Sequence, residues 1–192
     1  MTATRLSRRR DEAASSRAGY DRPAVHERPV KESQAVLIRW MGIIDANSAG
    51  FVHGGTVMKL CDEAAGIAAV KHSRRRVVTA AIDRMTFIEP VHVGELLTFK
   101  ASVNAVWRTS MEVGVRVEAE NPLTGDVRHT STAYLTMVAL DDGGRPTEVV
   151  PLAPQSAAEE RRMREAELRR RNRLGEREQI LAGRNESTRE AT

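Results

Sequence analysis

The stretch Asp45–Ala69, DANSAGFVHGGTVMKLCDEAAGIAA, changes from a loop to a helix within a few residues. Gly54 and Gly55 stand at the change: the Asn-Ser-Ala-Gly segment before them is typical of turns, and the apolar residues after them recur at helical spacing. Asp62 follows seven residues after Gly55, inside an otherwise apolar run. The fold and the function of the chain both depend on what a carboxylate does at this position.

A helix is predicted from Gly54 to about His72, and it has a wide apolar arc at about 100° per residue. The centre of the arc is formed by Val57, Leu60, Cys61, Ala64, Ile67 and Ala68. Asp62 falls at the edge of this arc, whereas Glu63 lies on the opposite face. A carboxylate at such a border can be partly buried and still meet water or a ligand, as a general base or a nucleophile must. An ordinary boundary aspartate is the alternative.

The start of the helix adds a second candidate feature. Backbone N–H groups at Gly54 and Gly55 have no partners inside the helix, and the positive end of the helix dipole lies there, so they can stabilise an oxyanion. Asp62 is roughly 11 Å from Gly55 along the helix axis, too far for both to act on one small carbonyl. Either Asp62 serves a site shared with a neighbouring chain, or the substrate bridges the gap. Asn47, in the preceding loop, is a turn residue whose amide could orient a water or a carbonyl.

The rest of the chain has the pattern of an antiparallel sheet. Apolar residues occupy every second position in 97–107 and 111–119, which is a strong strand signal. Three more strands are predicted at 35–44, 77–88 and 127–140. One long helix beside a meandering sheet predicts an α+β fold.

Composition divides the chain into three parts. Residues 1–33 lack hydrophobic periodicity and are predicted to form a disordered basic arm. Residues 34–153 form the single domain, and residues 154–192 are a charged helical tail with Glu and Arg at i,i+4 spacing.

Charge and cysteine content restrict the partners and the compartment. The formal net charge is +4, but residues 35–154 hold 12 Lys/Arg against 13 Asp/Glu, so the compact part has no basic surplus for nucleic acid. The single cysteine, Cys61, favours a reducing compartment. No apolar run approaches the ~18 residues of a membrane span, and no secretory signal is visible, so we predict a cytoplasmic protein without a membrane partner. The histidines show no metal-ligand spacing, so no metal is expected.

The pattern N-x-x-G-x-x-x-G-G-x-x-x-x-x-x-D, formed by Asn47, Gly50, Gly54, Gly55 and Asp62, resembles the signature of hotdog-fold acyl-CoA thioesterases of the cytosolic long-chain type. The stretch DRMTFIEPVHVGELL, 83–97, is similar to the same family, and the resemblance covers about residues 36–150. It implies a single hotdog domain, in which a long central helix is wrapped by an antiparallel sheet, with a C-terminal helical extension. It also implies a homodimer as the minimal unit and further assembly into hexamers of three dimers.

The resemblance implies hydrolysis of the thioester of fatty acyl-CoA to free fatty acid and CoA, with no cofactor beyond the CoA of the substrate. Asp62 would act as general base or nucleophile, and Asn47 would come from the opposite subunit. A backbone N–H near Gly54 or Gly55 would polarise the thioester oxygen.

The segment Arg108, Thr109 and Ser110 corresponds in the family to a place near CoA, where a guanidinium could pair with phosphate. Arg74–Arg76 is a second candidate for the phosphates, or simply a solvated turn. Three other functions stay open: a non-catalytic acyl-CoA-binding hotdog protein, a hotdog dehydratase or hydratase, and nucleic-acid binding through the basic arms.

Overall fold

The computed structural model describes residues 27–190, with side chains described to residue 183, and the predicted disorder of residues 1–26 lies outside this range. None of the helices in the described range is long and apolar enough to cross a membrane. The elements in chain order are β1 (Arg28–Pro29), a 3₁₀ helix (Val30–Ser33), β2 (Ala35–Trp40), a second 3₁₀ helix (Ile43–Asp45), α1 (Gly54–Ser73), β3 (Arg76–Phe87), β4 (Leu96–Val106), β5 (Ser110–Glu120), β6 (Val127–Leu140), β7 (Leu152–Ala153) and α2 (Ala157–Glu190).

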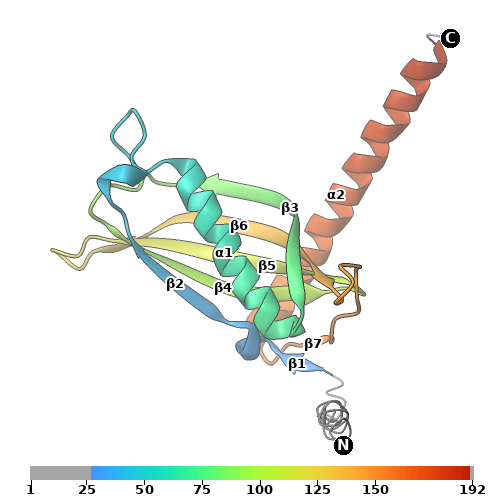
Figure 1. The fold of residues 1–192 in the computed structure, drawn as a ribbon, viewed down its shortest axis with the longest axis horizontal. Coiled ribbons are helices and arrows are strands. Elements are labelled where there is room, and N and C mark those ends of the chain that lie inside the picture. The colour runs from blue at the N-terminus through green and yellow to red at the C-terminus, as the bar shows by residue number, and fades with distance from the viewer. Residues whose placement is uncertain (1–26, 191–192) are drawn as a thin grey trace, which may run out of the picture.

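The main sheet has five antiparallel strands in the order β2–β4–β5–β6–β3, so β2 and β3 are its edges. The sheet curves around α1, which lies along one face (Figure 1). Two loops, 45–53 and 88–95, meet where α1 begins, joined by the Val52 N–H donating to the Val91 carbonyl at 2.8 Å. We call this the Asn47 end of the domain. The turn 107–109 lies at the other end with the last residues of α1, and we call this the Arg108 end.

The core forms between α1 and alternate residues of the central strands. Inward-facing Leu97, Phe99, Val113 and Leu135 are fully buried, which is the period-two pattern expected for one covered face. On the helix, four alanines are fully buried (Ala64, Ala65, Ala68 and Ala69), and their small side chains let α1 lie close against the sheet.

The fold class predicted from the sequence is confirmed: one long helix packs in a curved antiparallel sheet, and a C-terminal helix follows. The helix-wheel position of Ile67 was wrong, because its side chain is 46% exposed. The helix rests on the sheet through its alanines, which turns Ile67 away from the core.

Two predicted boundaries also differ from the structure. The strand predicted for 35–44 ends at Trp40, because the Asp45 carboxylate accepts the Gly42 N–H at 2.8 Å and closes a 3₁₀ turn. The ordered domain includes residues 28–33, which the sequence placed in the disordered arm. There, β1 pairs in parallel with β7, and Val30 is buried in the core.

The charged tail is helical, as predicted, and its first half is docked onto the domain. Arg169 donates to both carboxylate oxygens of Glu112 on β5, at 3.0 and 2.6 Å, and Arg173 pairs with Asp83 on β3. The first half of α2 lies on the sheet face opposite α1, and its second half projects away from the domain (Figure 1).

Candidate active site

Asp62 lies in the third turn of α1, half-buried, at the border predicted from the helix wheel. The Thr79 hydroxyl on β3 donates a hydrogen bond to the Asp62 carboxylate. The strand register shifts between Thr79 and Ala81, and such bulges often re-aim side chains beside functional sites. The edge strand β3 therefore fixes one carboxylate oxygen of Asp62.

Cys61, the neighbour of Asp62, is excluded as a nucleophile at neutral pH. Its side chain is buried in the core. Burial, with a smaller contribution from the Asp62 charge, raises the pKa of the Cys61 thiol to about 12. Because the thiolate is the reactive form, this thiol is inert and serves packing, as the sequence suggested.

Asn47 uses its amide oxygen to shape the loop before α1. The oxygen accepts the Ala49 N–H at 2.9 Å and the Phe51 N–H at 3.2 Å. Because both of these partners are donors, the amide must be oriented with its oxygen toward the loop, and its NH₂ group remains as a donor. Asn47 can therefore donate to a carbonyl or a water.

The two glycines at the start of α1 differ in what they offer. The Gly55 N–H already donates to His53 Nδ1 at 2.9 Å, because His53 caps the helix. The expectation that Gly55 offers a free N–H is therefore wrong in this conformation. Within residues 27–183, the Gly54 N–H has no acceptor, so it is the available donor.

Both glycines also have steric reasons to lack a side chain. A Cβ on Gly54 would lie 3.3 Å from the Phe87 ring, and one on Gly55 would lie 3.0 Å from the capping His53 nitrogen. The cap by His53 was missed in the sequence, because histidine is not among the residues that usually cap the start of a helix.

Asn47 and Gly54 line one hollow of about 360 Å³, and Asp62 is not among its lining residues. One wall comes from the loop before α1 and its first turn, and the other from the end of β3 and the next loop (Asn47, Phe51, Val52, Gly54, Val57, Phe87, Ile88, Glu89, Pro90, Val91). One chain therefore brings Asn47 and Gly54 together and keeps Asp62 apart from them. This agrees with the distance expected along the helix axis between Gly55 and Asp62.

Arg108 and Thr109 lie in the tight turn 107–109 between β4 and β5, at the Arg108 end, and Ser110 is the first residue of β5. The Arg108 and Thr109 carbonyls accept from Val149 and Ala139, which fixes the turn. The Arg108 side chain is exposed and has no ion-pair partner among the described side chains. Because α1 has 20 residues, about 30 Å of helix separates this end from Asn47.

A second hollow, of about 580 Å³, lies at the Arg108 end and is strongly basic. It is lined by Lys71, Arg74, Arg75 and Arg76, with Asp142 as its acidic residue. Arg76 donates to the carbonyls of Asp141 and Asp142, both at 2.8 Å, so its guanidinium is held in place. Among the described side chains, which end at residue 183, no His, Cys, Asp and Glu residues gather into a group that could hold a metal.

Comparison with known proteins identifies the family. Residues 49–125 match the family model described as Thioesterase superfamily. The chain is 35% identical over 129 residues to a Bacillus subtilis protein named uncharacterized acyl-CoA thioester hydrolase YkhA, covering 67% of this chain and 75% of that protein. It is 34% identical over 147 residues to the mouse cytosolic acyl coenzyme A thioester hydrolase, covering 74% of this chain but only 39% of the longer mouse protein.

Solved structures give the same result. An apo-hexameric acyl-CoA thioesterase is 39% identical with a TM-score of 0.76, covering 78% of this chain and 96% of its own. An acyl-CoA hydrolase from Staphylococcus aureus, solved with butyryl-CoA and CoA, is 31% identical with a TM-score of 0.76, covering 81% and 95%.

Three further structures of the Staphylococcus aureus hydrolase carry single alanine substitutions, at an asparagine, an aspartate and a threonine. The aspartate lies 15 positions after the asparagine, and the threonine 17 positions after the aspartate. The fold, the matched family model and these relatives together show that the chain belongs to the thioesterase superfamily, among its acyl-CoA thioester hydrolases.

Proposed function

We propose that this protein hydrolyses fatty acyl-CoA to free fatty acid and CoA, with Asp62 as the central catalytic residue. One observation carries the proposal. Asn47, Asp62 and Thr79 have the same spacing, 15 and 17 positions, as the three residues substituted in the Staphylococcus aureus hydrolase. Independently, Thr79 is the residue that hydrogen-bonds Asp62 here.

The site would be shared between two subunits. Asp62 and the Asn47 hollow are apart in one chain, and β3 is an edge strand with unpaired backbone groups that can pair with a second β3. A two-fold axis that pairs the strands antiparallel also reverses α1. It would therefore bring the Asn47 end of one subunit toward Asp62 and the Arg108 end of the other.

In this arrangement, Asp62 would remove a proton from water while the water oxygen forms a bond to the thioester carbonyl carbon. The Gly54 N–H and the Asn47 NH₂ of the partner subunit would donate to the carbonyl oxygen, or the amide would hold the water. The C–S bond then breaks, and the CoA sulfur takes its electron pair and the proton from Asp62. The products are the carboxylic acid and CoA.

A nucleophilic role of Asp62 is the second route. Its carboxylate oxygen would attack the carbonyl carbon and expel the CoA thiolate, and water would then cleave the mixed anhydride. A single turnover in H₂¹⁸O identifies the second route when water attacks the Asp62 carbon of the anhydride, because ¹⁸O then stays in the Asp62 carboxylate. Attack on the fatty-acyl carbon puts ¹⁸O only in the fatty acid, as the general-base route does, and that branch is identified by trapping the anhydride with hydroxylamine.

The CoA part would lie at the Arg108 end. Arg108 has an exposed guanidinium without an ion partner among the described side chains, on a turn with Thr109 and Ser110. The basic hollow of Lys71 and Arg74–Arg76 lies at the same end. Guanidinium groups bind phosphate oxygens in a bidentate way, so both are suited to the phosphates of CoA.

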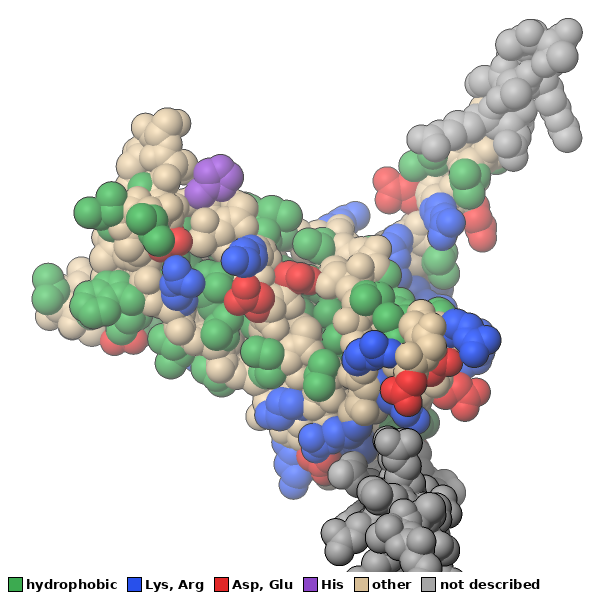
Figure 2. Space-filling view, in the orientation of Figure 1, with side chains coloured by type: hydrophobic (Ala, Val, Ile, Leu, Met, Phe, Trp, Pro, Cys, Tyr) green, Lys and Arg blue, Asp and Glu red, His purple; other side chains and the backbone are tan. Residues whose placement is uncertain are grey.

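We propose a hexamer of three dimers as the assembly, since several structural neighbours are hexameric. Such an assembly needs two different contacts. Two of the exposed apolar surfaces among the described side chains could supply them: the α1–β3 surface (Met58, Ile67, Val70, Val78, Ile82) and the β2 stripe (Val36, Ile38, Trp40). Figure 2 shows hydrophobic side chains between charged ones on the α1 side of the molecule.

A cytosolic location, as in the name of the mouse relative, fits the predicted compartment.

The decisive experiment is release of CoA thiol from acetyl-, octanoyl- and palmitoyl-CoA by the wild type, by Asp62→Asn and by Glu63→Gln. Glu63 is the exposed acid next to Asp62 on the same helix and serves as the matched control. Loss of a general base lowers kcat by about 10²–10⁴-fold, so Asp62→Asn should be nearly inactive and Glu63→Gln normal. Binding of acyl-CoA without turnover by the wild type would instead favour the non-catalytic binding protein.

A further inference from the structure

The loop 88–95, which joins β3 to β4, forms one wall of the Asn47 hollow. It contains no helix, and its one strand-like contact is the isolated bridge between His92 and Phe51. Four of its residues line the hollow (Ile88, Glu89, Pro90, Val91). A wall without regular secondary structure needs other contacts to hold its shape.

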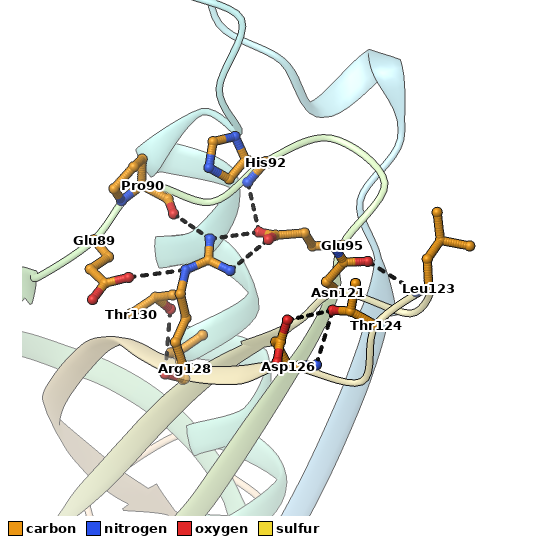
Figure 3. Close-up of polar contacts among 11 residues, drawn as sticks. Glu89, Pro90, His92, Glu95, Asn121, Leu123, Thr124, Asp126, Arg128 and Thr130 are labelled. Carbon is orange, nitrogen blue, oxygen red and sulfur yellow. Dashed lines mark hydrogen bonds and ion pairs between the residues drawn. The ribbon is translucent and has the colours of Figure 1, made fainter.

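Backbone hydrogen bonds hold the two ends of the loop, from the Ile88 N–H to the Thr130 carbonyl and from the Gly94 N–H to the Met41 carbonyl, both at 2.8 Å. Arg128, near the start of β6, supplies the side-chain contacts (Figure 3). Its guanidinium donates to both oxygens of Glu95, at 2.6 and 2.9 Å, and to the Pro90 carbonyl at 2.8 Å. It also forms an ion pair with Glu89 at 3.1 Å. One side chain thus ties three residues of the loop to the sheet.

Glu95 is the main partner of Arg128, and we call the two residues together the Arg128–Glu95 clamp. Glu95 is 7% exposed, and besides Arg128 it accepts the His92 N–H at 2.8 Å. Burial acts to raise the pKa of Glu95, but the hydrogen bonds from Arg128 and His92 outweigh it and hold the pKa below the usual value. The carboxylate is therefore charged, and the bidentate pair is intact, at neutral pH.

The clamp is connected to the catalytic groups through the chain before α1. The Val52 N–H donates to the Val91 carbonyl at 2.8 Å, and the Phe51 and His92 rings meet edge to face at 5.3 Å. The Phe51 carbonyl in turn accepts the Asn47 N–H at 2.7 Å. A displacement of loop 88–95 would therefore move the Asn47 loop and the first turn of α1.

We propose that Arg128 and Glu95 are positioning residues for the thioesterase reaction, which hold Asn47 in place through loop 88–95. This inference rests on the proposed function. Neither residue lines the hollow. Their effect is on the geometry of groups that do.

The test compares kcat and KM of the wild type, Arg128→Ala, Arg128→Lys and Arg116→Ala. The matched control, Arg116, is an arginine on the adjacent strand β5 and pairs with Glu118 at 2.8 Å. Small misplacements of catalytic groups cost up to about 100-fold in rate, so we expect Arg128→Ala to lower kcat at least about tenfold with KM changed less than about threefold. Arg128→Lys should recover only part of the rate, because an ammonium cannot form the bidentate contact. Arg116→Ala should match the wild type.

A double-variant cycle separates positioning from simple loss of folded protein. If Arg128 acts through Asn47, then Arg128→Ala should lower kcat by less than about twofold in the Asn47→Ala background. Hydrogen exchange of the peptides that contain Val52 and His92 should be faster in Arg128→Ala and unchanged in Arg116→Ala. Multiplicative rate effects in the cycle, or a kcat loss that only follows the folded fraction, would overturn the positioning role while leaving the thioesterase function intact. A wild type without turnover would overturn both.

Discussion

At the scale of single residues, the Thr79 hydroxyl is the group that holds the Asp62 carboxylate. Thr79→Val removes the donor and keeps the shape of the side chain. A hydrogen bond to a charged group contributes about 1.5–3 kcal/mol, so its loss in the transition state corresponds to a fall in kcat of roughly 10- to 100-fold. The measurement is the initial rate of CoA release at saturating acyl-CoA, with the melting temperature recorded in parallel.

Thr86→Val is the matched control for this prediction. Thr86 is an exposed threonine on the same strand β3 and is paired with Thr132 across the sheet. Equal rate losses in the two variants would mean that the effect comes from the strand and not from the hydrogen bond to Asp62.

The positions of the candidate site residues could be predicted in part from the sequence, and the missing part is non-local. The border position of Asp62 followed from helical spacing alone. Thr79 could not be chosen among the threonines of β3, because its contact depends on how the strand is registered against α1. The Gly55 N–H was assigned wrongly, because the histidine before it turned out to be the cap.

At the scale of elements, the docking of α2 depends on a buried ion pair. The Glu112 side chain is 1% exposed, and besides Arg169 it accepts from Asn104 at 3.1 Å. Arg169→Ala would leave this carboxylate buried without its cation, which costs about 3–5 kcal/mol of unfolding free energy. Chemical denaturation followed by circular dichroism measures the loss.

The double variant Glu112→Gln/Arg169→Ala should recover much of that stability, because no buried charge then lacks a partner. Arg171→Ala, an exposed arginine on the same helix, should change stability by less than ~0.5 kcal/mol. A double variant as unstable as Arg169→Ala would show that α2 is held by something other than this pair.

The difference between local patterns and contacts of distant residues explains which elements could be predicted from the sequence. The strands β4, β5 and β6 and the helix α1 follow from periods of two and 3.6, which are local patterns. The packing of α2 joins Arg169 to a residue 57 positions earlier. Short-range pattern carries no information on such a contact, so the tail was predicted as a helix but its docking was not.

At the scale of the whole molecule, the two faces of the sheet are covered unequally. α1 covers the inner face, and α2 covers part of the outer face through Glu112 and Asp83. The outer face of the edge strand β2 stays open: Val36, Ile38 and Trp40 are each more than 60% exposed. Three large apolar side chains in a row on an edge strand are typical of a protein contact.

We therefore expect Ile38→Glu to split the proposed hexamer into active dimers. Three dimers related by a three-fold axis need a contact separate from the one that pairs β3, and a charge buried at that contact, without a partner, opposes association. The site would be shared across β3 only, so kcat should stay within about twofold of the wild type, as for surface changes away from the chemistry. Sedimentation velocity gives the mass and CoA release gives the rate on the same sample.

Ile180→Glu, at an apolar side chain of α2 with 49% exposure, is the control and should leave the hexamer intact. A hexamer that survives Ile38→Glu would place the contact between dimers elsewhere, and dimers without activity would mean that the site needs neighbours from more than one interface.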